Sequence, residues 1–349
     1  MRKQHKQHSG IGGRDSGFTL VELMIAMVVG LFLIAVVGSV FVANKQSYRA
    51  NENLARIQEG IRVVNEMMSR EIREAGGNLC GTPLVANVLN NKDSAWWADW
   101  NAGPIQGFDG NQDTAPKSFG TATADRVTGT DALIIRGAAL LGGVVITQHN
   151  PAAAQFKVNT KNHGLSDDDI VMVCDYKTAA IFQVTNAQSG KNVTVVHNTG
   201  TAKPGNCSKG LGYPTICTTL GNQKKFLDGF LSRMTASFWY IGNNAQGGKS
   251  LFRMAVDGAP GSAGTPYEVL QDVVDMQLQY LTRAGTTLNN TYVGAGSISD
   301  WTDSATDLVV AVRVQLTMES ADKNIGTDGN ALQRLLLFAT SMRNRELVQ

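Results

Sequence analysis

The chain has 349 residues, a formal net charge of +2 and only 17% charged residues. No basic run follows the first few residues, so the charge gives no indication of nucleic-acid binding. With 43% hydrophobic residues the sequence is too apolar for a disordered chain, and its 37 glycines favour a β-rich domain with long surface loops.

Residues 18–43 form an apolar run that contains a single charged side chain, Glu22. Roughly 20 helical residues cross the hydrocarbon core of a membrane, so this run is long enough to span one. A charged group inside such a helix costs about 2.5–3.5 kcal/mol, and Glu22 therefore requires a partner. Its position in the first turn is one that the helix dipole favours for a carboxylate.

The segment before the apolar run has a basic excess, since Asp15 is outnumbered by Arg2, Lys3, Lys6 and Arg14. By the positive-inside rule this segment stays in the cytoplasm and the chain after Ala43 is exported. A cleaved secretory signal is a poor alternative because its apolar region has only about 7–15 residues. A plain membrane anchor explains the length of the run but leaves Glu22 unexplained.

The helical pattern continues beyond the apolar run. Apolar residues recur every three or four positions at Leu54, Ile57, Ile61, Val64, Met68 and Ile72. This spacing predicts an amphipathic helix that lays one stripe against a globular domain, and Gly76-Gly77 provides its end. We therefore expect residues 44–75 to extend the helix of residues 18–43.

Residues 76–349 are expected to form that domain. Residues 78–130 are irregular, and their tryptophans (Trp96, Trp97 and Trp100) are predicted to form local core. A second loop is expected at 199–224. Between and after these loops lie short β-like runs, at 132–136, 144–147, 169–175, 180–186, 193–197, 235–241, 250–256, 269–281 and 308–318. Residues 332–342 fit either a last strand or a short helix. Strands without interleaved long helices predict an antiparallel sheet and the α+β class.

Four cysteines, Cys80, Cys174, Cys207 and Cys217, lie in the exported part of the chain. An even number in an oxidising compartment predicts disulfides. Cys207 and Cys217 flank a loop rich in glycine and proline, which suits a small disulfide and would leave Cys80 to pair with Cys174. Three pairings are possible, however, and the sequence does not select one. A zinc site is not indicated, because there is no Cys-x-x-Cys and the histidines are scattered.

Three segments resemble ligand-binding motifs only in part. Residues 242–250 nearly match a phosphate-binding loop, but position 243 is Asn where the motif needs Gly, and a strand follows where it needs a helix. Asp109, Asn111 and Asp113 have calcium-loop spacing, but Thr114 replaces the turn glycine. The acidic residues Asp300, Asp303 and Asp307 match no known loop. We therefore predict no catalytic residue, no cofactor and no metal site.

The residues Gly17-Phe18-Thr19-Leu20-Val21-Glu22 resemble the signature of type IV prepilins. The resemblance implies that a prepilin peptidase cleaves between Gly17 and Phe18 and N-methylates Phe18. It also implies that Glu22 neutralises the terminal ammonium of a neighbouring subunit in a filament. On this interpretation residues 1–17 are a cleaved leader, 18–43 the transmembrane and polymerisation helix, and 76–349 a periplasmic head. The chain would be the substrate of an enzyme and not itself an enzyme.

Three head segments, residues 167–186, 269–281 and 334–347, look like the heads of PilW-type minor pilins. The resemblance implies a pilin-like fold and a subunit that helps to assemble or initiate a type IV pilus, for twitching motility, adhesion or DNA uptake. The implied partners are other minor pilins, the major pilin and the inner-membrane assembly platform. The implied location is the inner membrane and then the pilus at the cell surface.

Two alternatives remain open at this stage. The size and order of the segments also resemble minor pseudopilins of type II secretion systems. The chain could equally be a membrane-anchored periplasmic binding or adhesive domain that never polymerises.

Overall fold

The computed structural model describes residues 17–77, 80–82, 84–114, 116–201, 204–257, 264–322 and 330–345. The leader predicted at residues 1–17 therefore lies outside the described residues except for Gly17. The chain divides into two compact units, Met1–Asn53 and Leu54–Gln349, and each is described here by itself.

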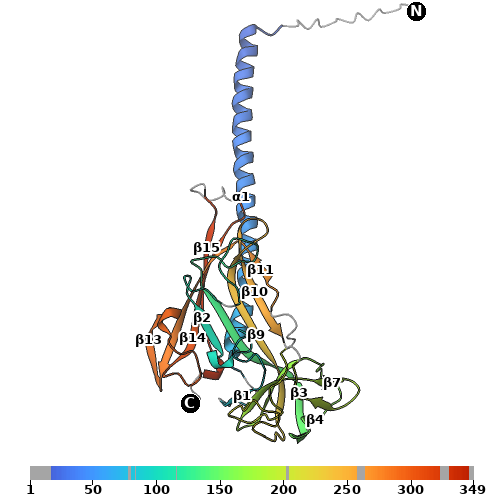
Figure 1. The fold of residues 1–349 in the computed structure, drawn as a ribbon. Coiled ribbons are helices and arrows are strands. Elements are labelled where there is room, and N and C mark those ends of the chain that lie inside the picture. The colour runs from blue at the N-terminus through green and yellow to red at the C-terminus, as the bar shows by residue number, and fades with distance from the viewer. Residues whose placement is uncertain are drawn as a thin grey trace, which may run out of the picture. The chain divides into compact units, whose positions relative to one another are not determined.

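A single long helix, α1 (Leu20–Glu74), passes through the boundary between the two units (Figure 1). In the first unit its apolar side chains are exposed. In the second unit the predicted stripe is buried at Ile57, Val64, Met68 and Ile72. The helix ends at the predicted glycines, because Gly76 takes a φ of +70°, which favours a residue without a Cβ.

The larger sheet has eleven strands among the described residues, with the central order β1-β6-β5-β9-β3-β4-β8-β7, and β2, β10 and β11 join it at the side. Its strands are β1 (Val85–Asn87), β2 (Ile105–Phe108), β3 (Ala132–Asn150), β4 (Gln155–Val158), β5 (Ile170–Cys174), β6 (Ala179–Gln183), β7 (Asn186–Ala187), β8 (Thr194–Val196), β9 (Phe230–Asn243), β10 (Lys249–Asp257) and β11 (Tyr267–Gln271).

The smaller sheet has the order β13-β12-β14-β15. Its strands are β12 (Val273–Ala284), β13 (Thr287–Val293), β14 (Asp307–Glu319) and β15 (Gln333–Ser341). Three short 3-10 helices complete the described structure: η1 (Trp100–Ala102), η2 (Ala295–Ser297) and η3 (Arg343–Arg345). The predicted α+β class is confirmed.

The arrangement of strands differs from the prediction in several places. There are two sheets instead of one, and β1 pairs with β6 in parallel. The runs expected at 132–136 and 144–147 belong to one strand, β3, whose register shifts between Leu140 and Val145. The irregular segment 78–130 contains β1 and β2, which are too short to show a period. Residues 332–342 contain a strand, β15, and not a helix.

The main core lies between the helix and both sheets. Met68 and Ile72 of α1 belong to the same buried cluster as Trp239 of β9, Leu278 of β12 and Leu316 of β14. A separate cluster holds the buried Trp97, with Trp96 and Trp100 packed against it. The helix from Leu54 onward is therefore an integral part of the head's core.

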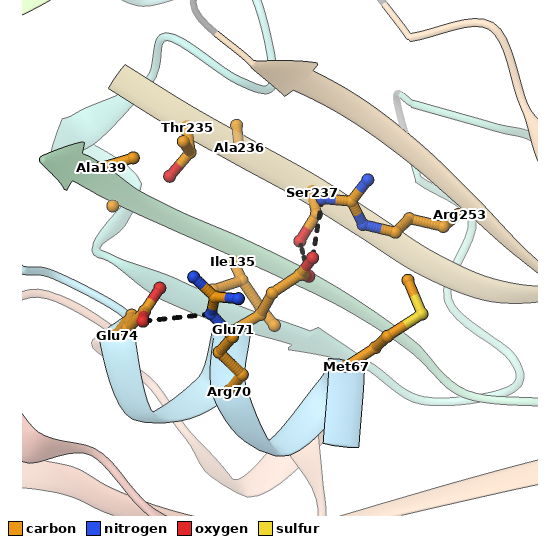
Figure 2. Close-up of a pocket in the computed structure, with 11 residues that line it drawn as sticks. Met67, Arg70, Glu71, Glu74, Ile135, Ala139, Thr235, Ala236, Ser237 and Arg253 are labelled. Carbon is orange, nitrogen blue, oxygen red and sulfur yellow. Dashed lines mark hydrogen bonds and ion pairs between the residues drawn. The ribbon is translucent and has the colours of Figure 1, made fainter. Parts of the chain in front are cut away.

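A half-buried carboxylate, Glu71, fixes the end of this helix on the larger sheet. Glu71 Oε2 accepts hydrogen bonds from Ser237 Oγ and Trp239 Nε1, each at 2.6 Å, and Glu71 Oε1 pairs with Arg253 at 2.6 Å. Figure 2 shows Glu71, Ser237 and Arg253 beside a cavity of about 320 Å³ between α1 and strands β3, β9 and β10. We refer to Glu71 and its three partners as the Glu71 clamp.

Replacing Glu71 by alanine should lower the free energy of unfolding by about 2–4 kcal/mol, because the sheet donors lose a shared, largely desolvated acceptor. Tryptophan fluorescence during denaturation of the full-length chain in detergent measures this change. The matched control is Glu74→Ala, since Glu74 pairs with Arg70 at the surface, where an ion pair contributes about 0–1 kcal/mol. Equal effects of the two substitutions would contradict the role given to Glu71.

A buried pair of histidines lies between β3 and the segment after β8, beside a further hydrophobic cluster that contains Phe156, Phe182 and Phe226. His149 Nε2 and His197 Nε2 are 3.2 Å apart, and the Phe226 amide donates to His149 Nδ1 at 3.0 Å. Phe156 packs against both rings. Burial, together with the charge of Lys225, lowers the pKa of His149 to about 4. Burial and the neighbouring His149 also lower the pKa of His197.

The head should therefore lose stability as the pH falls below about 6.5, because unfolded histidine then binds protons that the buried rings exclude. At pH 5 His149 alone should lower the free energy of unfolding by about 2 kcal/mol. In a His149→Asn variant the side-chain oxygen can still accept from Phe226, and this part of the pH dependence should disappear.

The measurement is the difference in unfolding free energy between the wild type and His149→Asn at pH 7.5 and at pH 5. Taking the difference cancels the contributions of other titrating groups to the pH dependence. Asp131 is one such group, because burial raises its pKa to about 6. A difference that does not change with pH would contradict the assignment.

Candidate assembly site at the N-terminus

Thr19 and Glu22 form a reciprocal cap at the start of α1. Glu22 Oε2 accepts hydrogen bonds from the Thr19 amide and from Thr19 Oγ1, both at 3.0 Å, and the Glu22 amide donates to Thr19 Oγ1 at 3.3 Å. This is a capping box, in which two amides that the helix cannot satisfy receive side-chain acceptors. The helix dipole also favours the negative charge at this end.

The cap gives Glu22 a local partner but does not use the whole carboxylate. The bonds found among the described residues all reach Oε2, so Oε1 can accept from a further donor. Because Glu22 is exposed within its unit, such a donor can come from another molecule. Gly17 and Phe18 lie immediately before the helix and are also exposed. The bond predicted to be cleaved is thus accessible, and the amine that cleavage creates lies next to the cap.

The helix around the cap presents an apolar surface on all sides. An 18-residue window of α1 has a mean hydropathy of 2.9, and none of that window is buried within the described structure. Phe18 is 88% exposed, and large apolar side chains remain exposed at Leu20, Val21, Leu23, Met24, Ile25, Met27, Val28, Val29, Leu31, Phe32, Leu33, Ile34, Val36, Val37, Val40, Phe41 and Val42. A surface of this kind requires lipid or apolar helices of other subunits around it.

The cysteines form two disulfides, Cys80–Cys174 and Cys207–Cys217. The first joins the segment shortly after α1 to the end of β5 across a sequence separation of 94 residues. The second closes a small loop with a separation of 10 residues. Of the three pairings that the sequence allowed, the structure contains this one.

The segments with partial ligand motifs serve the structure of loops. In the hairpin that joins β9 to β10, Asn244 Oδ1 accepts from the Gln246 and Gly248 amides, which are donors that a phosphate would need. Asp109 accepts from the amides of Ala295 and Gly296.

Two further acidic residues of those motifs also bond within the chain. Asp113 accepts from the Phe119 amide, and Asp303 pairs with Arg345. Within the described part of the chain, no three His, Cys, Asp or Glu side chains are placed to share a metal ion.

Thr19→Val should remove the side-chain part of the cap while it leaves the Glu22 carboxylate in place. The expected cost is about 1 kcal/mol, confined to the first turn of α1. Amide hydrogen exchange of the full-length chain in detergent should show faster exchange at Leu20–Leu23 and unchanged exchange in the strands. Thr19→Ser, which keeps the hydroxyl, is the matched control, and equal exchange in both variants would contradict the capping box.

The helix with its capped carboxylate and the disulfide-linked β head together form a pilin-like α+β architecture. Two family models match parts of the chain. Residues 13–38 match the Prokaryotic N-terminal methylation motif, and residues 238–340 match Type IV Pilus-assembly protein W. The two matches cover less than half of the chain, and they support a PilW-like type IV pilin, which is a structural pilus component. No curated protein and no solved structure matches it.

The second match extends from the later half of β9 through β15. It contains the head segment 269–281 and the first half of 334–347, which the sequence had related to PilW-type pilins. The segment 167–186, also related to them, lies outside the match.

Proposed function

We propose that this protein is a minor pilin that enters a type IV pilus through α1. The observation that carries this proposal is the capped carboxylate of Glu22, which is the sole charge in the exposed apolar run of residues 18–43 and has one oxygen left for a second donor. The two family matches support the class of protein. The assignment to assembly or initiation of the pilus is ours.

The first step is processing at the membrane. A prepilin peptidase cleaves between Gly17 and Phe18 on the cytoplasmic side and N-methylates the new amine of Phe18. Cleavage removes the basic leader and leaves a short terminus at the edge of the apolar helix. Until assembly, α1 holds the subunit in the inner membrane and the head lies in the periplasm.

The second step is transfer of α1 from lipid into the filament. Glu22 Oε1 then accepts from the methylated ammonium of a neighbouring subunit, while Oε2 keeps its bonds to Thr19. Each of these charges is costly in an apolar medium, and pairing removes most of that cost. The partners in this step are the assembly platform, other minor pilins and the major pilin. Twitching motility, adhesion or DNA uptake would follow from the assembled pilus.

Glu22→Gln tests this step, because glutamine can maintain a capping box but carries no charge. We expect incorporation into sheared pili to fall about a hundredfold, since an unpaired ammonium in the filament core costs about 3 kcal/mol. Thr19→Val, which keeps the charge and weakens the cap, should still be incorporated. Immunoblots of sheared pili, normalised to the protein in the membrane, measure both variants.

Mass spectrometry of the same samples shows whether processing has occurred, because the mature chain should begin at methylated Phe18. Normal incorporation of Glu22→Gln would refute the proposed pairing. If deletion of the protein abolishes protein secretion and leaves pili intact, it is a pseudopilin. If neither process is affected, the anchored binding domain is the better interpretation.

A further inference from the structure

The smaller sheet has an open edge at β15. Among the described strands this nine-residue strand pairs with β14 alone, and its register is continuous from Gln333 to Ser341. Natural sheets protect edge strands of this length with charged side chains, proline or a bulge. The sequence of β15, QRLLLFATS, has one charged residue, Arg334 near its start, and no proline, and the pairing shows no bulge.

Apolar side chains are exposed at this edge on the face of the sheet that points away from the core. Leu336 and Phe338 pack against the main core, whereas Leu335 and Leu337 are 57% and 56% exposed. The neighbouring strands present polar side chains on the same outer face, namely Gln277, Gln279, Arg313, Gln315 and Thr317. The outer face is therefore polar in its centre and apolar along β15.

The opposite edge, β13, is mostly polar and its pairing with β12 has a register shift between Leu281 and Arg283, but it also exposes an apolar side chain, Leu288. Leu288 is 51% exposed, and its register partner is Arg283. Tyr292 pairs with Leu281, and its ring lies 3.7 Å from the Arg313 guanidinium, which places it on the outer face. Figure 1 shows β13 at a free margin of the head. Both margins of one sheet thus carry apolar groups on one face.

The directions of the strands make these two margins complementary. β12 is antiparallel to β13 and to β14, and β14 is antiparallel to β15. β13 and β15 therefore run in opposite directions. When two copies of the chain point the same way, β15 of one copy meets β13 of the next as an antiparallel pair, and the outer faces coincide. Pairing β15 with a second β15 would require one copy to be turned over.

We propose that a second copy of this chain adds its β13 to the open β15 edge, so that the smaller sheets of two heads become continuous. The new main-chain hydrogen bonds satisfy the edge groups of both strands, and Leu335 and Leu337 are covered by Leu288. The contact joins different surfaces of the two copies, and such contacts generate open assemblies. The inference rests on the proposed function in one respect: copies anchored in the same membrane point the same way.

Cysteine cross-linking in membranes tests the contact with the full-length chain. One tagged copy carries Leu337→Cys and a differently tagged copy carries Leu288→Cys, and a short bismaleimide is added to cells that express both. We expect the yield of the cross-linked dimer from Leu337→Cys and Leu288→Cys to be several-fold higher than the yield from Gln279→Cys and Leu288→Cys. Gln279 is the control because it lies on the polar centre of the same face. All three sites are at the surface, where substitution has little effect on folding.

A mixed product no stronger than the Gln279→Cys control would overturn the proposal, and so would a dominant product between two Leu337→Cys copies. As a second measurement, Leu335→Lys with Leu337→Lys should abolish co-purification of the two tagged copies, while both disulfides and protease resistance are retained. Unchanged co-purification contradicts the proposal.

The cross-link should persist in a Glu22→Gln background, where subunits remain in the membrane. Persistence there separates contact between heads from entry into the filament. Loss of the cross-link in that background would show that filament packing, and not the strand edge, brings the copies together.

Discussion

Glu22 is the one charged residue in the apolar run of residues 18–43, and it needs a partner there. A carboxylate in an apolar helix is tolerable only where donors reach it, and Thr19 supplies two of them at the first turn. This local arrangement allows the helix to remain in lipid with its charge satisfied. It also leaves the carboxylate able to accept a further bond, so the same group can serve before and after assembly.

The head in turn depends on a second carboxylate, Glu71, that is satisfied in a different way. Its donors come from strands more than 160 residues away in sequence, and they hold the last turns of α1 against the larger sheet. Two of these partners, Trp239 and Arg253, lie within the segment that matches Type IV Pilus-assembly protein W. The disulfide-bearing part of the head, before β9, lies outside it. The matched segment thus contains the elements that connect head and helix.

The sequence predicted what depends on local pattern. The apolar run, the helical stripe and the terminating glycines are short-range features, and all three reappear in the structure. The spacing of Thr19 and Glu22 is also that of a capping box. From the sequence, however, the only partner expected for Glu22 was the terminal ammonium of a neighbouring subunit. The role of Glu71 could not be recognised from the sequence. It lies next to Ile72 of the apolar helical stripe, and a charged residue in that position is usually one that faces solvent. β13 was missed because TLNNTYV is polar and gains its stability from pairing with β12.

The Cys80–Cys174 disulfide gives the head a defined response to mechanical force. Tension applied through α1 would reach the larger sheet through the core packing of the helix and the hydrogen bonds around Glu71. Farther along the chain, the bond between Cys80 and Cys174 joins the segment after the helix directly to β5 in the middle of the larger sheet. The residues between the two cysteines form a covalently closed loop. A load passed through this bond cannot extend that loop, whatever happens to the non-covalent contacts.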